Sequence, residues 1–120
     1  MVITLYLTFD LTFNGDYAGL YKWLDSHKAL ECGDSACRLN YNVAYGRLET
    51  YADTQTVLGL IREDIASKVN FTSKDRVYVA SVFPDDKNVK RLAGRFIIGV
   101  RKPNPWDGAA GIIDDDPKID

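Results

Sequence analysis

Residues 2–10 alternate between apolar and polar side chains with a period of two. This period places successive side chains on opposite faces of a strand, so one face is predicted to be buried. The expected buried face consists of Ile3, Leu5, Leu7 and Phe9, and the other consists of Val2, Thr4, Tyr6, Thr8 and Asp10. The pattern therefore predicts a first strand that ends at Asp10.

Two later segments carry apolar side chains at helical spacing. The first follows Asp16, a suitable N-cap, and is expected to end near His27. Its apolar stripe consists of Tyr17, Leu20, Tyr21 and Leu24, widened by Trp23. The second helix is expected to be capped by Asp53 or Thr54, and its stripe consists of Val57, Leu58, Ile61, Ile65 and Val69.

Four further segments are predicted to form strands, at residues 29–32, 36–45, 76–83 and 94–100. The order is then strand, helix, two strands, helix, strand, with one strand added. A split βαβ unit repeated in this way predicts an α+β ferredoxin-like sandwich. In that fold an antiparallel sheet carries two helices on one face, here with an extra C-terminal strand. The opposite face, which holds Tyr6, Thr8 and Asp10, is expected to bind a ligand or a second copy of the chain, so that a homodimer is predicted.

The 120 residues allow one compact domain, expected at residues 1–105, and the acidic segment 106–120 is expected to be a flexible tail. The net charge of −2 argues against a broadly basic protein that coats nucleic acid. No apolar run approaches the roughly 20 residues of a membrane span, so no membrane partner is expected. The first ten residues lack a basic leader and a cleavage signature, which favours a cytoplasmic protein.

The chain has two cysteines, Cys32 and Cys37, and one histidine, His27. Together they could supply three metal ligands, but no second ligand pair lies nearby in the sequence. A disulfide across a hairpin is also open, although a cytoplasmic setting disfavours it. We interpret both cysteines as ordinary buried or half-buried thiols, and His27 as a residue at a helix C-terminus, favoured by the dipole.

Four segments carry a resemblance to a known family: Phe9-Asp10, residues 17–24, Asp34-Ser35, and residues 74–79. Together they resemble the small CRISPR-associated endoribonuclease-like family and its virulence-associated protein D relatives, over residues 1–83. The resemblance implies a ferredoxin-like homodimer in which the aspartates that close the two first strands approach each other. It also implies that Asp10 is the catalytic and metal-binding residue, with Mg²⁺ or Mn²⁺ as the cofactor for phosphodiester cleavage. The alternative is that Asp10 only ends a strand or bonds a loop.

The sequence departs from that family in two places. Residues 11–15 carry no basic side chain, whereas the family often has basic residues just after the first-strand aspartate. The chain also continues beyond the usual core through residues 94–108. This extension overlaps a basic stretch, since residues 84–104 carry a net charge of +4 and residues 105–120 a net charge of −4.

The basic stretch and the tryptophan after it predict a contact with RNA or DNA, through phosphate pairing and base stacking. The residues expected to make it are Lys90, Arg91, Arg101, Lys102 and Trp106. The alternative is an edge strand that Lys and Arg protect from aggregation, with Trp106 packed on the core.

Two functional hypotheses follow from these observations. The first is a small dimeric protein that associates with nucleic acid and acts as a metal-dependent endoribonuclease through Asp10. The second is a non-catalytic module that binds a protein partner, for example a phage or mobile-element inhibitor.

Overall fold

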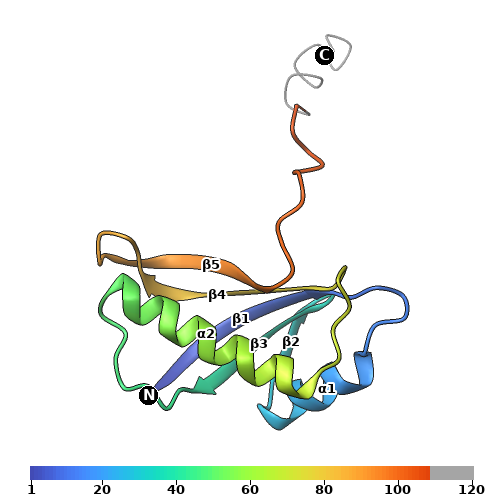
Figure 1. Ribbon diagram of the computed structural model, residues 1–120, viewed down its shortest axis with the longest axis horizontal. Coiled ribbons are helices and arrows are strands. Elements are labelled where there is room, and N and C mark those ends of the chain that lie inside the picture. Colours follow the sequence, from blue (N-terminus) through green and yellow to red (C-terminus); the bar gives the residue numbers. More distant parts are fainter. Residues whose placement is uncertain (109–120) are drawn as a thin grey trace.

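The computed structural model describes residues 1–108 of the chain. The elements in order are β1 (Val2–Asp10), α1 (Tyr17–Ser26), β2 (Leu30–Gly33), β3 (Ala36–Asn42), α2 (Tyr51–Lys68), β4 (Arg76–Pro84) and β5 (Lys90–Ile98). The five strands form one antiparallel sheet in the order β2-β3-β1-β4-β5. Figure 1 shows that β1 runs through the centre of this sheet. The predicted α+β class with two helices and an added strand is confirmed.

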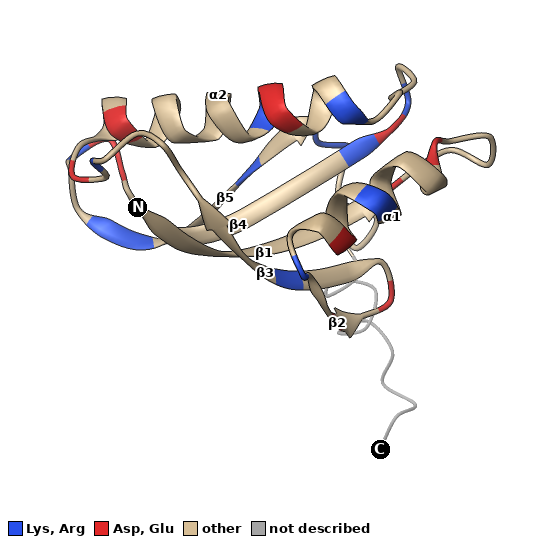
Figure 2. Cartoon of the chain, turned by 90° about the horizontal axis from the view of Figure 1, so that it is seen from below, with Lys and Arg blue, Asp and Glu red and all other residues tan. Residues whose placement is uncertain are grey.

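Both helices lie on one face of the sheet (Figure 2). The odd-numbered face of β1 points toward them, and Leu5 and Leu7 on it are fully buried. In the predicted helical stripes, the buried residues are Leu20, Trp23, Leu24, Val57, Ile61, Ile65 and Val69. Phe9, Tyr17 and Leu58 are only half-buried, and Tyr21 is exposed. The other face of the sheet, called the open face below, carries the even-numbered side chains of β1.

Several element boundaries differ from the predictions. Strand β3 ends at Asn42 rather than residue 45, and β5 begins at Lys90 rather than residue 94. The earlier start arises because Asp85 accepts backbone hydrogen bonds at the turn, which returns the chain antiparallel to β4. No helix in the described part of the chain is long and apolar enough to cross a membrane.

Helix α1 begins as predicted, with the Asp16 side chain accepting the Gly19 N–H. The predicted cap of α2 is wrong. Thr50 is the N-cap, and Asp53 is the third helical residue of a capping box, in which each side chain accepts the other residue's N–H. A β-region conformation at Thr50 allows this arrangement, since capping residues adopt non-helical angles.

The capping box makes the stability of the fold depend on pH. The Glu49 N–H and the Tyr45 hydroxyl donate to the Asp53 carboxylate, and these bonds lower its pKa to about 2. An unfolded Asp titrates near pH ~3.9, so the stabilisation is fully present above that pH and is lost as pH falls toward 2. We expect the Asp53→Asn variant to lose less stability than the wild type between pH 4 and 2, measured by urea denaturation. Equal losses in both proteins over this range would contradict the assignment.

Candidate functional site

A recess lies on the open face where β1 ends. Its volume is about 260 Å³, and it takes side chains from β1, β4, β5 and the segment that follows β5. The residues that line it are Thr8, Phe9, Asp10, Arg76, Tyr78, Phe96 and Arg101. We call this site the aromatic recess. It brings together positions that are up to 93 residues apart in the chain.

Two aromatic rings and two guanidinium groups form the centre of the aromatic recess. The rings of Tyr78 and Phe96 meet edge to face, with their centroids 5.0 Å apart. The Arg101 guanidinium lies 5.9 Å from the Tyr78 ring centroid and 5.5 Å from that of Phe96. The Arg76 guanidinium lies 5.4 Å from the Phe96 centroid. Such cation–π contacts hold both cations beside the half-buried aromatic rings.

Two glycines shape the aromatic recess: Gly94 lies within β5, and Gly99 directly follows β5. A side chain at Gly94 would overlap the Tyr78 hydroxyl, so glycine lets the Tyr78 ring lie along the strand. Gly99 has a φ of +76°, and a Cβ there would lie 2.5 Å from the carbonyl oxygen of Asp75. Positive φ is readily adopted by glycine. The chain therefore turns directly after β5, which brings Arg101 back over the two rings.

Asp10 is paired with an arginine. Arg76 Nη2 donates to Asp10 Oδ2 at 2.8 Å, and the Asp10 side chain is 59% exposed. The Arg76 Nε is buried and has no hydrogen-bond partner among the described residues. A buried donor without a partner is uncommon in folded proteins.

The surroundings of Asp10 within one chain do not fit a divalent cation. One carboxylate oxygen is already used by Arg76, and Arg101 adds a second positive charge to the same recess. Mg²⁺ is held by carboxylates and other oxygen ligands, whereas cationic neighbours repel it. The described residues include no group of three or more His, Cys, Asp or Glu side chains placed to hold a metal ion.

A buried aspartate holds the loops next to the aromatic recess. Asp75 precedes β4, and its two carboxylate oxygens accept the N–H groups of Thr12 and Thr72 at 2.7 and 2.6 Å. Burial by itself raises the pKa of Asp75, but these hydrogen bonds outweigh burial and lower it. The carboxylate thereby ties the segment after Asp10 to the segment before Arg76, which fixes the ends of β1 and β4 relative to each other.

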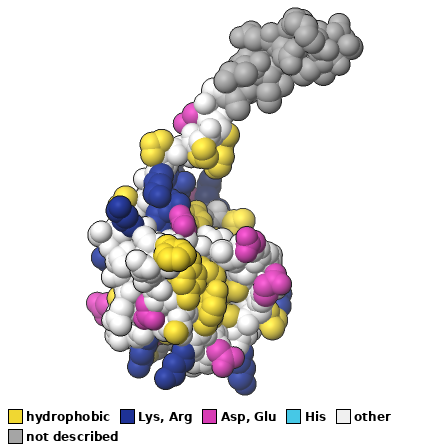
Figure 3. Space-filling model, turned by 90° about the vertical axis from the view of Figure 1, so that its right-hand side faces the viewer, with side chains coloured by type: hydrophobic (Ala, Val, Ile, Leu, Met, Phe, Trp, Pro, Cys, Tyr) yellow, Lys and Arg dark blue, Asp and Glu magenta, His cyan; other side chains and the backbone are white. Residues whose placement is uncertain are grey.

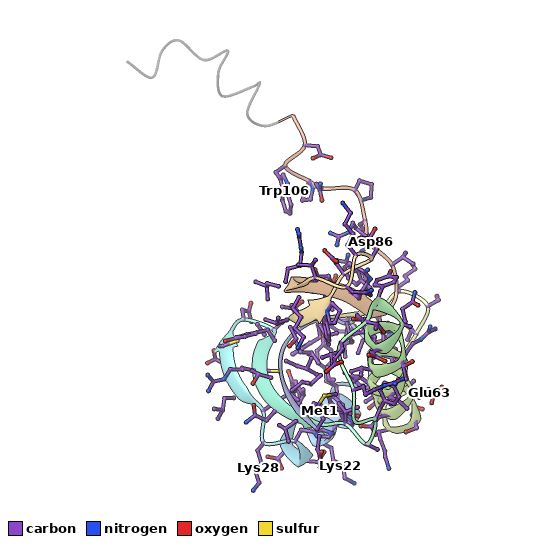
Figure 4. The ribbon with its side chains drawn as sticks, turned by 90° about the vertical axis from the view of Figure 1, so that its left-hand side faces the viewer. Met1, Lys22, Lys28, Glu63, Asp86 and Trp106 are labelled. Atoms are coloured by element: carbon purple, nitrogen blue, oxygen red, sulfur yellow. The ribbon has the colours of Figure 1, made fainter. Side chains whose placement is uncertain are left out.

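The residues predicted to bind nucleic acid do not form one surface. Arg101 lies in the aromatic recess, and Lys102 follows it as an exposed residue. Lys90 and Arg91 lie at the opposite end of β5, where Arg91 Nε is 2.9 Å from Asp85 Oδ2. Trp106 is 66% exposed and lies beyond the body of the domain (Figure 4). The alternative interpretation that Trp106 packs on the core is therefore wrong. The acidic residues Asp114–Asp116 lie outside the described residues.

The cysteines and the histidine are dispersed. Cys32 is exposed and Cys37 is buried, and both are free, so the predicted burial is confirmed only for Cys37. Burial raises the pKa of the Cys37 thiol to about 11, which keeps it protonated. His27 is the C-cap of α1, as its sequence position predicts, and its Nε2 lies 3.6 Å from Asp64 Oδ2.

Sequence reasoning missed Arg76, Tyr78 and Phe96 as members of a site. The sequence feature that could have identified two of them is the period-two pattern of residues 76–83, because it assigns Arg76 and Tyr78 to one face of their strand. The antiparallel pairing of β1 with β4 places Tyr78 opposite Thr8 and Arg76 opposite Asp10. That register depends on the tertiary fold and is not encoded in a local motif.

Comparisons with protein-family models, with curated proteins and with solved structures found no match for this chain. The resemblance to the small CRISPR-associated family stays a prediction.

Proposed function

We propose that this protein binds single-stranded nucleic acid through the aromatic recess and acts there without cleaving it. The observation that carries the proposal is the combination of two half-buried aromatic rings with two guanidinium groups in one recess. Proteins that bind single strands stack bases on aromatic side chains and pair phosphates with basic ones. The guanidinium groups of Arg76 and Arg101 supply donors for phosphate oxygens.

The fold that we propose is the ferredoxin-like sandwich with β5 added beside β4. Two features support it. Each helix connects two parallel strands that have one antiparallel strand between them, and the order β2-β3-β1-β4 has β1 and β3 at its centre. In this architecture the helices cover one face and leave the other for a ligand, which agrees with the place of the aromatic recess.

Fluorescence anisotropy tests the proposed function. A labelled RNA octamer of uridines and a DNA octamer of thymidines are titrated with the full chain at low salt, with and without Mg²⁺ or Mn²⁺. We expect binding without metal and an intact octamer on a denaturing gel. Cleavage that needs a metal ion would favour the endoribonuclease hypothesis. Absence of binding to both octamers would overturn the proposal and favour the protein-interaction module.

The Asp10→Asn variant separates binding from metal-dependent cleavage. In the proposed site Asp10 offsets part of the positive charge of Arg76, so its neutralisation should strengthen octamer binding by about threefold, the size of an exposed charge interaction. In a metal-dependent nuclease the same change would remove a cation ligand and abolish cleavage. Weaker binding by the variant in the absence of metal would contradict the role assigned to Asp10.

We also propose that the chain forms a homodimer through the other end of the open face. There Val2, Val82 and Leu92 are 63%, 54% and 72% exposed. Val82 pairs with Leu92 across β4 and β5 and lines one recess with Val2, and exposed apolar surface of this kind favours association. Sedimentation equilibrium at micromolar concentration should give the mass of two chains, and the Leu92→Glu variant should give the mass of one. A wild-type mass of one chain would overturn this proposal and leave the aromatic recess unaffected.

A further inference from the structure

A second recess lies on the helix-bearing side of the sheet, between α1 and the β2–β3 hairpin. We call it the hairpin recess. Its volume is about 440 Å³, within the roughly 300–1,000 Å³ that small-molecule sites occupy. Phe9 lines both this recess and the aromatic recess, so the two lie next to each other at the end of β1. Figure 3 faces this end of the molecule and shows hydrophobic side chains gathered at its centre, with acidic and basic side chains around them.

The hairpin recess has an aromatic wall. The side chain of Tyr21 on α1 is 53% exposed, and its ring meets that of Phe9 edge-on, with an interplanar angle of 71° and centroids 6.2 Å apart. An edge-on contact leaves a face of the Tyr21 ring for a flat ligand, since aromatic pairs stack in offset or edge-to-face arrangements. Leu24 and Cys37 are buried and line the recess with apolar surface.

Two carboxylates complete the hairpin recess. Glu31 Oε1 accepts the Gly33 N–H at 2.6 Å, which leaves the second carboxylate oxygen for a ligand. Asp34 lies in the turn of the hairpin. Within the described residues, no ion pair includes Glu31 or Asp34. The recess is therefore acidic, so it disfavours phosphate groups and favours ligands that carry N–H donors.

We propose that the hairpin recess binds one unstacked nucleobase of a strand held in the aromatic recess, and that it selects guanine. The inference rests on the proposed function. Guanine presents adjacent N1–H and N2–H₂ donors, which pair with the two oxygens of Asp34, while the second oxygen of Glu31 adds to the negative charge of the recess. Uracil presents one N–H between two carbonyl oxygens, which a carboxylate repels. The flat base lies on Tyr21, while its phosphates stay with Arg76 and Arg101.

Base selectivity in octamers tests this inference. An RNA octamer of uridines is compared with octamers that carry one guanosine or one inosine at the fourth position. We expect the guanosine octamer to bind roughly tenfold more tightly, as one bidentate contact permits. Inosine lacks the 2-amino group and should give a smaller gain. The Glu31→Gln/Asp34→Asn variant should lose the preference, so that it binds the three octamers with equal affinity.

Matched controls separate the two proposals. Glu63 is an exposed residue of α2 and lies away from the hairpin recess (Figure 4). The Glu63→Gln variant therefore also loses a carboxylate but should keep the guanosine preference. Equal binding of all three octamers by the wild type would overturn the inference and leave the proposed function standing. A preference that survives in Glu31→Gln/Asp34→Asn would also overturn it.

A second measurement uses single nucleotides in place of the octamers. Guanosine monophosphate should shift the amide NMR signals of Ala29, Glu31 and Cys37, and uridine monophosphate should not. If no octamer binds, these shifts still support the hairpin recess while the proposed function fails. If neither the octamers nor guanosine monophosphate bind, both proposals fail.

Discussion

The Tyr78→Ala variant is expected to bind a single-stranded octamer roughly ten- to a hundredfold more weakly than the wild-type chain, because base–aromatic stacking contributes about 1–3 kcal/mol per base. Tyr78 also holds Arg101 beside Phe96, so its loss loosens a phosphate contact as well. Anisotropy titrations at fixed salt measure the change. Unchanged affinity with an unchanged fold by circular dichroism would exclude Tyr78 from the binding surface.

The salt dependence of octamer binding shows which end of β5 contacts the phosphates. Replacing Arg101 and Lys102 by Gln should reduce affinity and flatten the log–log salt slope by about 1.4, since each phosphate contact on a single strand contributes about 0.7. Replacing Lys90 and Arg91 by Gln removes the same charge at the opposite end of the strand and should leave the slope unchanged. If the two double variants have equal effects, the nucleic acid binds along the whole of β5. That result would contradict the aromatic recess as the binding site.

The Leu7→Ala variant is expected to lower the free energy of unfolding by roughly 2–5 kcal/mol, as deletion of a buried leucine side chain does. Leu7 is fully buried, and its strand lies between β3 and β4, where it pairs with Cys37 and Val79. The adjacent Thr8→Ala change on the open face should cost less than about 0.5 kcal/mol. Urea denaturation measures both, and a Leu7→Ala midpoint equal to that of the wild type would contradict the assigned core face.

The fold was largely predictable because its central strand carries an uninterrupted period of two. Ile3, Leu5 and Leu7 all face the helices, and Val57, Ile61 and Ile65 of α2 pack into the same core. The ends of the helices and strands were harder to predict, because they depend on side chains that accept hydrogen bonds from backbone N–H groups. Thr50 begins α2 through such a bond, and Asp85 sets the turn before β5.

The candidate site was less predictable, since strand pairing rather than local sequence assembles it. Asp10 and Arg101 were expected to act in separate sites, yet both line the aromatic recess. The partner of Asp10 is Arg76, which is 66 residues away in the chain. The basic residues before and after Gly94 form one stretch in the sequence, but a nine-residue strand separates Lys90 from the end at which Arg101 lies.

Amide NMR of the full chain with the uridine octamer tests the central claim most directly. We expect the largest shifts at Thr8, Tyr78 and Phe96 on the open face, and no shift of exposed α2 residues such as Arg62. Shifts concentrated on α2, with the open face unchanged while the octamer binds, would contradict it.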